Sequence, residues 1–196
     1  RRTEKSTDSE RPEQQVVIGA GWSGKRIEEF MHTVGRTLND VDSLVVKNEH
    51  TDHSKGVGVL ARRYGMDVYA KQKTWDAMAP KIGKIKPEQK DLLEAGKVLS
   101  LGDLDVESVG VSHDAADPQF YEMHHAGHSF AIVTDTGYVS ERVEGVIRDA
   151  EAILMECNHD TEMLRMGPYP WTLQQRIMSD TGHLSNEDGA RALIDV

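Results

Sequence analysis

Cysteine is nearly missing from this sequence of 196 residues, which contains only Cys157. One cysteine excludes a disulfide within the chain and is typical of proteins in a reducing compartment. No apolar run approaches the roughly 18 residues that suggest a membrane span, and the first fifteen residues lack the apolar stretch of a secretory signal. These absences predict a cytoplasmic protein without a membrane partner.

Positive charge is also scarce, with 23 Lys and Arg against 33 Asp and Glu and a formal net charge of −10. This argues against a nucleic-acid partner, because phosphate backbones attract cationic side chains. Bound divalent metals or a local basic cluster could offset the deficit. Two clusters could form a basic rim or an ordinary solvated helix face: Arg62, Arg63, Lys71 and Lys73, and then Lys81, Lys84 and Lys86.

The composition is otherwise that of one globular domain. A hydrophobic content of 38% lies in the ordinary range for such proteins, and the length suits a single core. Residues 1–15 are polar and rich in Ser, Glu, Arg and Gln, which predicts a disordered leader. Residues 16–196 are then expected to form the domain.

Hydrophobic periodicity predicts the order of the elements. Apolar strands alternate with helical segments in the first part of the chain, and apolar residues then recur with period two from Lys97 onward. The glycine in "HHAGHS" (124–129) indicates a hairpin turn, and the end of the chain has helical spacing. This order predicts an α/β (α+β) protein, in which helices cover both sides of a mixed sheet layer.

Residues that can bind metals follow the ends of several predicted segments. They are His50 and His53 after "SLVV", His113 after "VESVGVS", Asp135 after "FAIVT", His159 after "EAILME", and His183 before the last helix. Loops at one rim of a layered α/β protein converge, so we expect these side chains to lie close together.

The stretch "NEHTDH" (48–53) has the spacing of a metal site. Alternate residues of an extended segment point the same way, so Asn48, His50 and Asp52 share one side, while His53 enters the next helix. Two imidazoles and a carboxylate are ligands that zinc, manganese or iron accept. A single histidine at a strand end is usually just hydrogen-bonded, but this combination predicts a metal-dependent site.

"NEHTDH" also resembles the HxHxDH signature of the metallo-β-lactamase fold, with Asn48 in place of the first histidine. Five longer segments are similar to the YycJ/WalJ branch of that fold: "HTDHSKGVGVLARRYGMDVYA", "GDLDVESVGVSHDAADPQFY", "TDTGYVSERV", "ECNHDTEMLRMGPYPW" and "SDTGHLSNEDGA". The resemblance implies a four-layer αββα sandwich with two divalent metal ions, Zn or Mn, at its open edge.

The resemblance further implies which residues bind the two ions. The first ion would take Asn48, His50 and His113, the second would take Asp52, His53 and His183, and Asp135 would bridge them. The branch is associated with phosphodiester hydrolysis, as a 5′-to-3′ exonuclease on double-stranded DNA.

Two metals that share a hydroxide suit an in-line displacement at phosphorus. Asp52 is the candidate to orient the hydroxide, and His159 is the candidate to protonate the leaving oxygen, with a structural role as its alternative. Asn158, Ser185 and Asn186 could contact a phosphate, although capping the last helix is the other role for Ser185. Trp75, Tyr169 and Trp171 either stack on bases or pack in the core.

Three features depart from the family pattern. Asn48 offers a neutral oxygen instead of an imidazole, and Lys47 puts a cation beside the metals where the family has a threonine, so both disfavour the first ion. Gly19 replaces an aspartate that supports the histidine loop in relatives. The opening strand of the family and its Gly- and Ser-rich turn have no counterpart, so the sandwich is expected to lack its first N-terminal strand.

These departures leave three hypotheses. The first is an active metallo-phosphodiesterase that acts on DNA. The second is an impaired or non-catalytic paralogue with a defective first metal site. The third is a hydrolase of another ester, thioester or lactam substrate.

Overall fold

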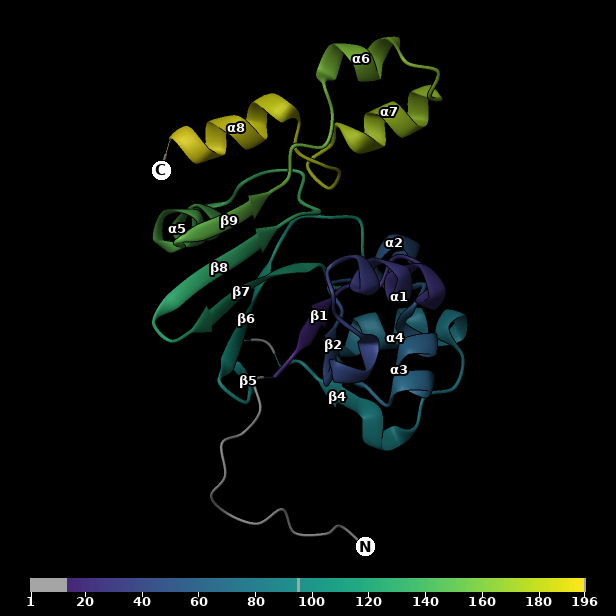
Figure 1. Cartoon of the computed structure of the whole chain (residues 1–196). Helices are drawn as coiled ribbons and strands as arrows, with labels where there is room; N and C mark the ends of the chain where they lie inside the picture. The colour runs from purple at the N-terminus through teal and green to yellow at the C-terminus, as the bar shows by residue number, and fades with distance from the viewer. Residues whose placement is uncertain (1–13, 95, 196) are drawn as a thin grey trace, which may run out of the picture.

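The computed structural model describes residues 14–94 and 96–195, and its strands form two sheets with helices on the outside (Figure 1). Most of the predicted leader, residues 1–13, lies outside the described residues. Among the helices that are described, none has the length and apolar character needed to cross a membrane.

The first sheet is parallel throughout, and its strands follow one another in the order of the chain. They are β1 (Val16–Ile18), β2 (Ser43–Val45), β3 (Asp67–Ala70) and β4 (Lys90–Leu92). Because parallel strands all end at one edge, the loops that follow them converge there. The sequence did not predict β4, since this short strand carries two charged residues and no apolar alternation.

The second sheet is antiparallel except for its last pair, β8 and β9, which is parallel. Its strands are β5 (Leu99–Leu101), β6 (Leu104–Gly110), β7 (Gln119–His125), β8 (His128–Val133) and β9 (Ala152–Met155). The predicted hairpin joins β7 to β8 through Ala126 and Gly127, with φ of 50° and 83°. Two positive φ angles are typical of the tight turn that suits strand twist.

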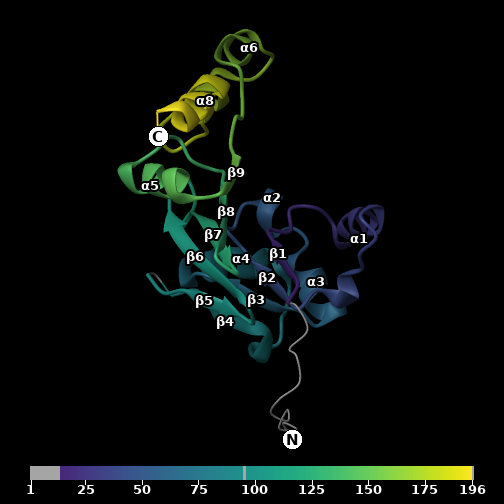
Figure 2. The ribbon, with the colours of Figure 1, turned by 60° about the vertical axis from the view of Figure 1, so that its left-hand side comes forward.

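Helices cover the outer face of each sheet (Figure 2). The first sheet is covered by α1 (Gly24–Thr33), α3 (Val57–Tyr64) and α4 (Gln72–Ile82), and the second by α5 (Glu141–Asp149) and α8 (Asn186–Ile194). The shorter helices are α2 (Thr51–Ser54), α6 (Thr161–Met166) and α7 (Trp171–Ile177), with 3₁₀ turns at Leu38–Asp40 and Pro87–Gln89.

Helical spacing in the sequence predicts two apolar faces. One would be formed by Ile27, Phe30, Met31 and Val34, and the other by Val57, Leu60 and Ala61 in a helix that ends at Gly65. In α3, Val57, Leu60 and Ala61 are fully buried, and Gly65 ends the helix with a φ of 74°, as predicted. In α1, Ile27 and Met31 pack on the core as expected, but Phe30 and Val34 are exposed. Phe30 instead packs edge-to-face on Trp22, itself an exposed residue.

The two sheets face each other across an apolar layer that includes Val45 of β2, Val106 of β6 and Tyr121 of β7. The layer order is therefore helix, sheet, sheet, helix, which confirms the predicted αββα sandwich. Burial of Val45 in this layer fixes the end of β2, from which the candidate metal-binding segment continues.

A hydrogen bond at Tyr121 joins the two sheets close to that segment. The hydroxyl group of this buried tyrosine donates to the Val46 carbonyl at 2.8 Å and accepts from Gln119 Nε2 at 2.8 Å. Burial raises the pKa of Tyr121, so its hydroxyl stays protonated and remains a donor. The bond holds the backbone one residue before Lys47.

Replacing Tyr121 with Phe is expected to lower the free energy of unfolding by ~1–3 kcal/mol, because the Val46 carbonyl and the Gln119 amide lose a buried partner. Urea unfolding of the metal-free protein measures this difference. Tyr138→Phe is the matched control, since Tyr138 is 49% exposed. Equal losses of stability in the two variants would contradict the role assigned to the Tyr121 hydroxyl.

Candidate metal centre

The first candidate residues lie on the segment that follows β2. The chain leaves β2 at Val45 and enters α2 at Thr51, so that His50 precedes the helical turn and His53 lies within it. The β1–α1 loop packs on this turn, and Ala20 N donates to the His53 carbonyl at 2.8 Å. A Cβ at Gly21 would lie 1.6 Å from the Asp52 carbonyl oxygen, so only glycine permits this approach.

Three more segments bring candidate residues to the same edge. His113 follows β6, Asp135 follows β8, and His183 lies between α7 and α8. Asp135 has a φ of 60°, a left-handed conformation that is uncommon for a residue with a side chain. Strained backbone of this kind is often found at functional sites.

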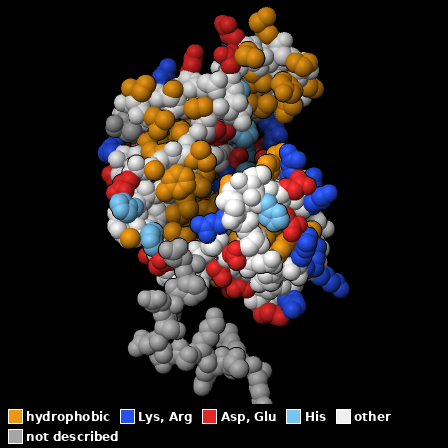
Figure 3. Space-filling view, in the orientation of Figure 1, with side chains coloured by type: hydrophobic (Ala, Val, Ile, Leu, Met, Phe, Trp, Pro, Cys, Tyr) orange, Lys and Arg blue, Asp and Glu red, His pale blue; other side chains and the backbone are white. Residues whose placement is uncertain are grey.

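Besides a group that joins His50 and His113 with Asp114, the structure brings these side chains together in two groups. Ligand atoms of His113, Asp135 and His183 lie within 4.8 Å of one another, and so do those of Asp52, His53 and Asp135. Asp135 belongs to both groups, which is the place that the resemblance predicts for a bridging ligand. Figure 3 shows histidine and acidic side chains where the part of the molecule with α6–α8 meets the part with α1–α4.

His113 and His183 each use one ring nitrogen to hold their orientation. His113 Nδ1 donates to the Gly182 carbonyl at 3.0 Å, and His183 Nδ1 donates to Glu156 Oε1 at 2.6 Å. Since both partners are acceptors, the proton of each neutral ring resides on Nδ1 and the Nε2 lone pair is available to an ion. Burial lowers the pKa of His113, which favours its neutral form.

Glu156 is a candidate supporting residue that the sequence does not predict. It is buried at the end of β9, and its hydrogen bond raises the pKa of His183. Its other oxygen, Oε2, accepts from Thr136 N at 3.1 Å, which ties the Asp135 loop to His183. The only sequence signal was an acidic residue directly after an apolar strand.

Asp135 is charged and closely surrounded by nitrogen atoms. Lys47 Nζ and His53 Nε2 both lie 2.8 Å from its Oδ2, and Asn48 Nδ2 lies at 3.5 Å. Burial by itself would raise the pKa of this carboxyl group, but the adjacent His53 and Lys47 outweigh it and hold the pKa well below its usual range. The carboxylate is therefore ionised and able to bind a cation.

His53 provides a test of whether the residues fit a metal ion. Its Nε2 is buried and has no hydrogen-bond partner among the described residues, even though Asp135 Oδ2 is only 2.8 Å away. The carboxylate oxygen thus lies off the direction of a ring N–H. An unpartnered imidazole nitrogen beside an ionised carboxylate is a donor set that suits a divalent metal.

The donor set predicted for the first ion does not fit in the same way. Asn48 Oδ1 accepts a hydrogen bond from His50 N at 3.0 Å, and its amide nitrogen points to Asp135. His50 Nε2 pairs with the Asp114 carbonyl at 3.1 Å, which requires a proton on that nitrogen. The structure therefore brings His50 near His113 and Asp114, but Asn48 Oδ1 and His50 Nε2 are both engaged in hydrogen bonds within the protein.

Asp114 is a second residue that the sequence reasoning missed. Its carboxylate accepts two hydrogen bonds from Arg176 of α7, one of them at 3.0 Å to Nη2. These bonds lower the pKa of Asp114. The pair holds α7 against the loop that carries His113, although its residues are 62 positions apart in the chain.

The predicted catalytic residues lie at the rim of the centre. The Asp52 side chain is 74% exposed, with Oδ2 at 3.5 Å from His53 Nε2. His159 pairs with Ser185 through a backbone bridge, and its Nδ1 is buried without a partner among the described residues. Burial lowers the pKa of His159, and the nearby charge of His183 lowers it further. Ser185 caps α8 by accepting from Asp188 N, as its alternative role predicted.

Gly19 lies where its side chain would face the centre. A Cβ built at this residue would lie 3.6 Å from His53 Nδ1, and the backbone has a φ of 72°. An aspartate there could reach the ring, and aspartate tolerates this conformation better than most residues. The structure thus gives a physical basis for the supporting role that the resemblance implies for this position.

The predicted basic rim and aromatic contacts are only partly available. Arg62 donates to the Ile82 carbonyl, Arg63 pairs with Glu28, and Lys71 pairs with Asp117. These three cations are therefore engaged within the protein rather than free for a phosphate backbone.

Trp75 is buried in the core, which was one of its two predicted roles, and its Nε1 donates to the Asp91 carbonyl. Tyr169 and Trp171 are 52% and 68% exposed, so the expectation that they pack in the core is wrong. Stacking on bases remains open to both of them.

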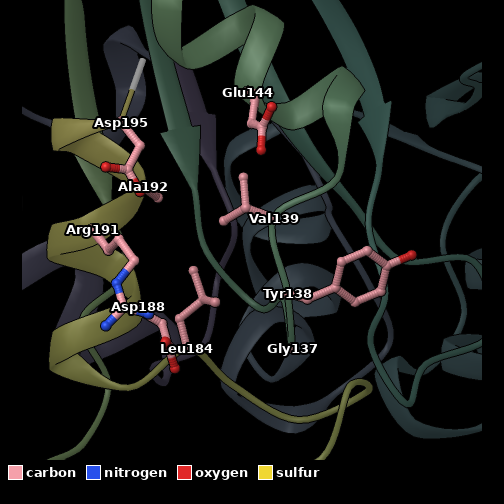
Figure 4. A pocket seen from close by; sticks show the side chains of 9 residues that line it. All are labelled: Gly137, Tyr138, Val139, Glu144, Leu184, Asp188, Arg191, Ala192 and Asp195. Atoms are coloured by element: carbon pink, nitrogen blue, oxygen red, sulfur yellow. The ribbon is translucent and has the colours of Figure 1, made fainter.

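A cavity of about 370 Å³ opens beside α8 (Figure 4). Its lining includes Arg191 together with Glu144, Asp188 and Asp195. None of the candidate metal ligands lines this cavity, and its acidic side chains do not suit a phosphate. The candidate ligands lie instead at the loop edge of the sandwich.

The domain model described as "Beta-lactamase superfamily domain" matches residues 14–196. The chain belongs to this superfamily. Among solved structures, the fold is similar to Zn²⁺-bound PqqB from Methylobacterium extorquens, with a TM-score of 0.67 and 18% identity over 92% of this chain and 69% of that one.

Two curated relatives match far more closely. The chain is 51% identical over 184 residues to Exodeoxyribonuclease YycJ of Bacillus anthracis, and 50% identical over 187 residues to Exodeoxyribonuclease WalJ of Streptococcus pneumoniae. Each match covers 94% of this chain and 70% of the relative. These findings confirm the resemblance to the YycJ/WalJ branch and support a hydrolase.

The role of Glu156 leads to a prediction for metal affinity. Glu156→Gln removes the charged acceptor of His183 Nδ1, so we expect affinity for Zn²⁺ to fall by ~10- to 100-fold. Competition titration with a chromogenic chelator measures it. Glu151→Gln is the matched control, because Glu151 forms the same pair with exposed His128 at 2.6 Å. An unchanged affinity in Glu156→Gln would show that this pair does not support a ligand.

Proposed function

We propose that the chain is a metal-dependent phosphodiesterase that degrades DNA as a 5′-to-3′ exonuclease. The observation that carries this proposal is the convergence of His113, Asp135 and His183 at the loop edge of the sandwich. It is supported by the names of the two relatives that share half of the residues.

The ion would be held by His113, Asp135 and His183, while Asp52 and His53 form a second group around the same carboxylate. A bound Zn²⁺ or Mn²⁺ lowers the pKa of water and neutralises charge on a phosphate. The protein keeps the two imidazoles oriented through Gly182 and Glu156. This arrangement fixes the donor atoms before an ion arrives.

The remaining polar groups would position water and phosphate. Asp52 is exposed at the mouth of the centre and can accept a hydrogen bond from an incoming water. The lowered pKa of His159 favours a neutral ring, which makes it a weak acid at neutral pH. We therefore assign His159 to hydrogen bonding with the phosphate rather than to protonation of the leaving oxygen.

A surface for DNA would extend from the centre along α7. This helix begins at exposed Trp171, and its far end contacts the site through the Ile177 carbonyl, which accepts from His183 N at 2.9 Å. Exposed aromatic rings bind single-stranded nucleic acid by stacking on bases. The net charge of −10 suits weak, short-range contact with DNA better than strong electrostatic attraction. We also propose that the protein acts in the cytoplasm, because a single cysteine without a disulfide partner in the chain is typical of a reducing compartment.

Digestion of duplex DNA tests the proposal. With Mn²⁺, Mg²⁺ or Zn²⁺, the protein is expected to release a 5′-end label early as short products, while a 3′-labelled strand shortens gradually. His183→Ala should slow the reaction by more than ~100-fold, the upper effect of supporting residues at metal sites. His128→Ala, at an exposed pair, should leave it unchanged. DNA that stays intact with all three metals would refute the proposal.

An impaired paralogue is the second candidate, favoured by the contact between Lys47 and Asp135 and by the engaged Asn48 oxygen. In that case the native chain leaves DNA intact, and the double variant Lys47→Thr with Asn48→His cleaves it under the same conditions. If the double variant is equally inert, these residues are not the cause.

A further inference from the structure

Lys47 is a buried cation inside the candidate centre. Its side chain is 5% exposed, and its Nζ donates to Asp135 Oδ2 at 2.8 Å and also to Thr134 Oγ1. An ammonium group withdrawn from water is stable only when it is paired and hydrogen-bonded. Both partners belong to the loop that follows β8, so Lys47 is fixed at the loop that holds the shared carboxylate.

The Asp135 oxygen that Lys47 contacts is already crowded. His53 Nε2 lies 2.8 Å from the same Oδ2, and Asn48 Nδ2 lies 3.5 Å from it. A metal–oxygen bond is about 2 Å long, so a divalent ion between His53 and this oxygen would come close to the ammonium. Two cations at that distance repel strongly in a site shielded from water.

Asn48 cannot compensate for this repulsion. It is fully buried, its Oδ1 accepts from His50 N, and its amide nitrogen faces the carboxylate. The residue expected to supply a donor to the first ion therefore directs N–H groups at the shared carboxylate instead. By contrast, the His113 and His183 rings use Nδ1 for their hydrogen bonds, and no cation among the described residues is bonded to either ring.

We propose that the Lys47 ammonium takes the place of one of the two metal ions expected for this fold. The chain then binds a single divalent ion, through His113, Asp135 and His183, beside a fixed positive charge. This inference rests on the metal-dependent function proposed above, but it concerns the number of ions and not the substrate.

Zinc content per chain tests the proposal directly. Elemental analysis after equilibration with Zn²⁺ and gel filtration is expected to give one ion for the native protein. The double variant Lys47→Thr with Asn48→His should give two, because it removes the cation and adds an imidazole. Two ions in the native protein, or one in the double variant, would overturn the proposal.

Single variants locate the ion. His113→Ala should lose it, whereas His53→Ala should keep it. Glu122→Gln should also keep it, which separates the centre from another group of possible ligands, Glu107, Glu122 and His124 on β6 and β7. Loss of the ion in Glu122→Gln, or its retention in His113→Ala, would place it elsewhere and overturn the assignment.

Thermal unfolding gives a second readout if the double variant folds poorly. Lys47→Met keeps the length of the side chain and removes its charge, so its metal-free form should melt lower, and Zn²⁺ should raise its melting temperature more than that of the native protein. Lys71→Met is the matched control, because Lys71 is almost as buried and pairs with Asp117 at 3.1 Å. A Zn²⁺-induced shift in Lys47→Met no larger than in the native protein would contradict the proposal.

The single-ion proposal and the proposed DNA cleavage can each be refuted without the other. A protein that binds two ions and degrades DNA would overturn this inference and leave the proposed function intact. A protein that binds one ion at His113 and leaves DNA intact would support the inference and refute the function.

Discussion

The ionised carboxylate of Asp135 is the group on which the rest of the centre depends. It is buried, and it belongs both to the group with His113 and His183 and to the group with Asp52 and His53. A buried negative charge requires compensation, and this chain provides it through Lys47 and His53. Any ion that binds here therefore meets a carboxylate whose negative charge is already partly balanced. A site built from neutral and acidic ligands alone would lack such a balancing cation.

The sandwich explains why such a carboxylate can be held in place. The parallel first sheet and the β8–β9 pair of the second sheet direct the loops after β2, β8 and β9 toward one edge. Tyr121 bonds across the sheets to the backbone beside Lys47, and Glu156 joins the Asp135 loop to His183. These buried hydrogen bonds make the site stiff before any ion binds, because each leaves a costly unpaired group if it breaks.

The surroundings of the centre match a substrate that approaches an open edge. The lining of the cavity beside α8 includes three acidic residues and none of the candidate ligands. Exposed Trp171 lies on the helix that Arg176 anchors to Asp114, so an aromatic surface is attached rigidly to the loop that carries His113. With a net charge of −10, recognition of a polyanion would depend on the bound ion and on stacking rather than on a broad basic surface.

The sequence by itself determined the fold class, most of the strands and helices, and the segments that carry the candidate ligands. Period-two and helical spacing are local properties, and the hairpin at Ala126–Gly127 depends on a few neighbouring residues. Local patterns missed β4, whose charged residues do not alternate, and placed Phe30, Val34 and Trp171 inside when they are exposed. Only the tertiary structure decided that Lys47 pairs with Asp135, 88 positions away, and that Glu156 orients His183. Such contacts depend on how the two sheets and their loops pack together. A pattern within a single segment cannot predict which residues of distant segments will meet.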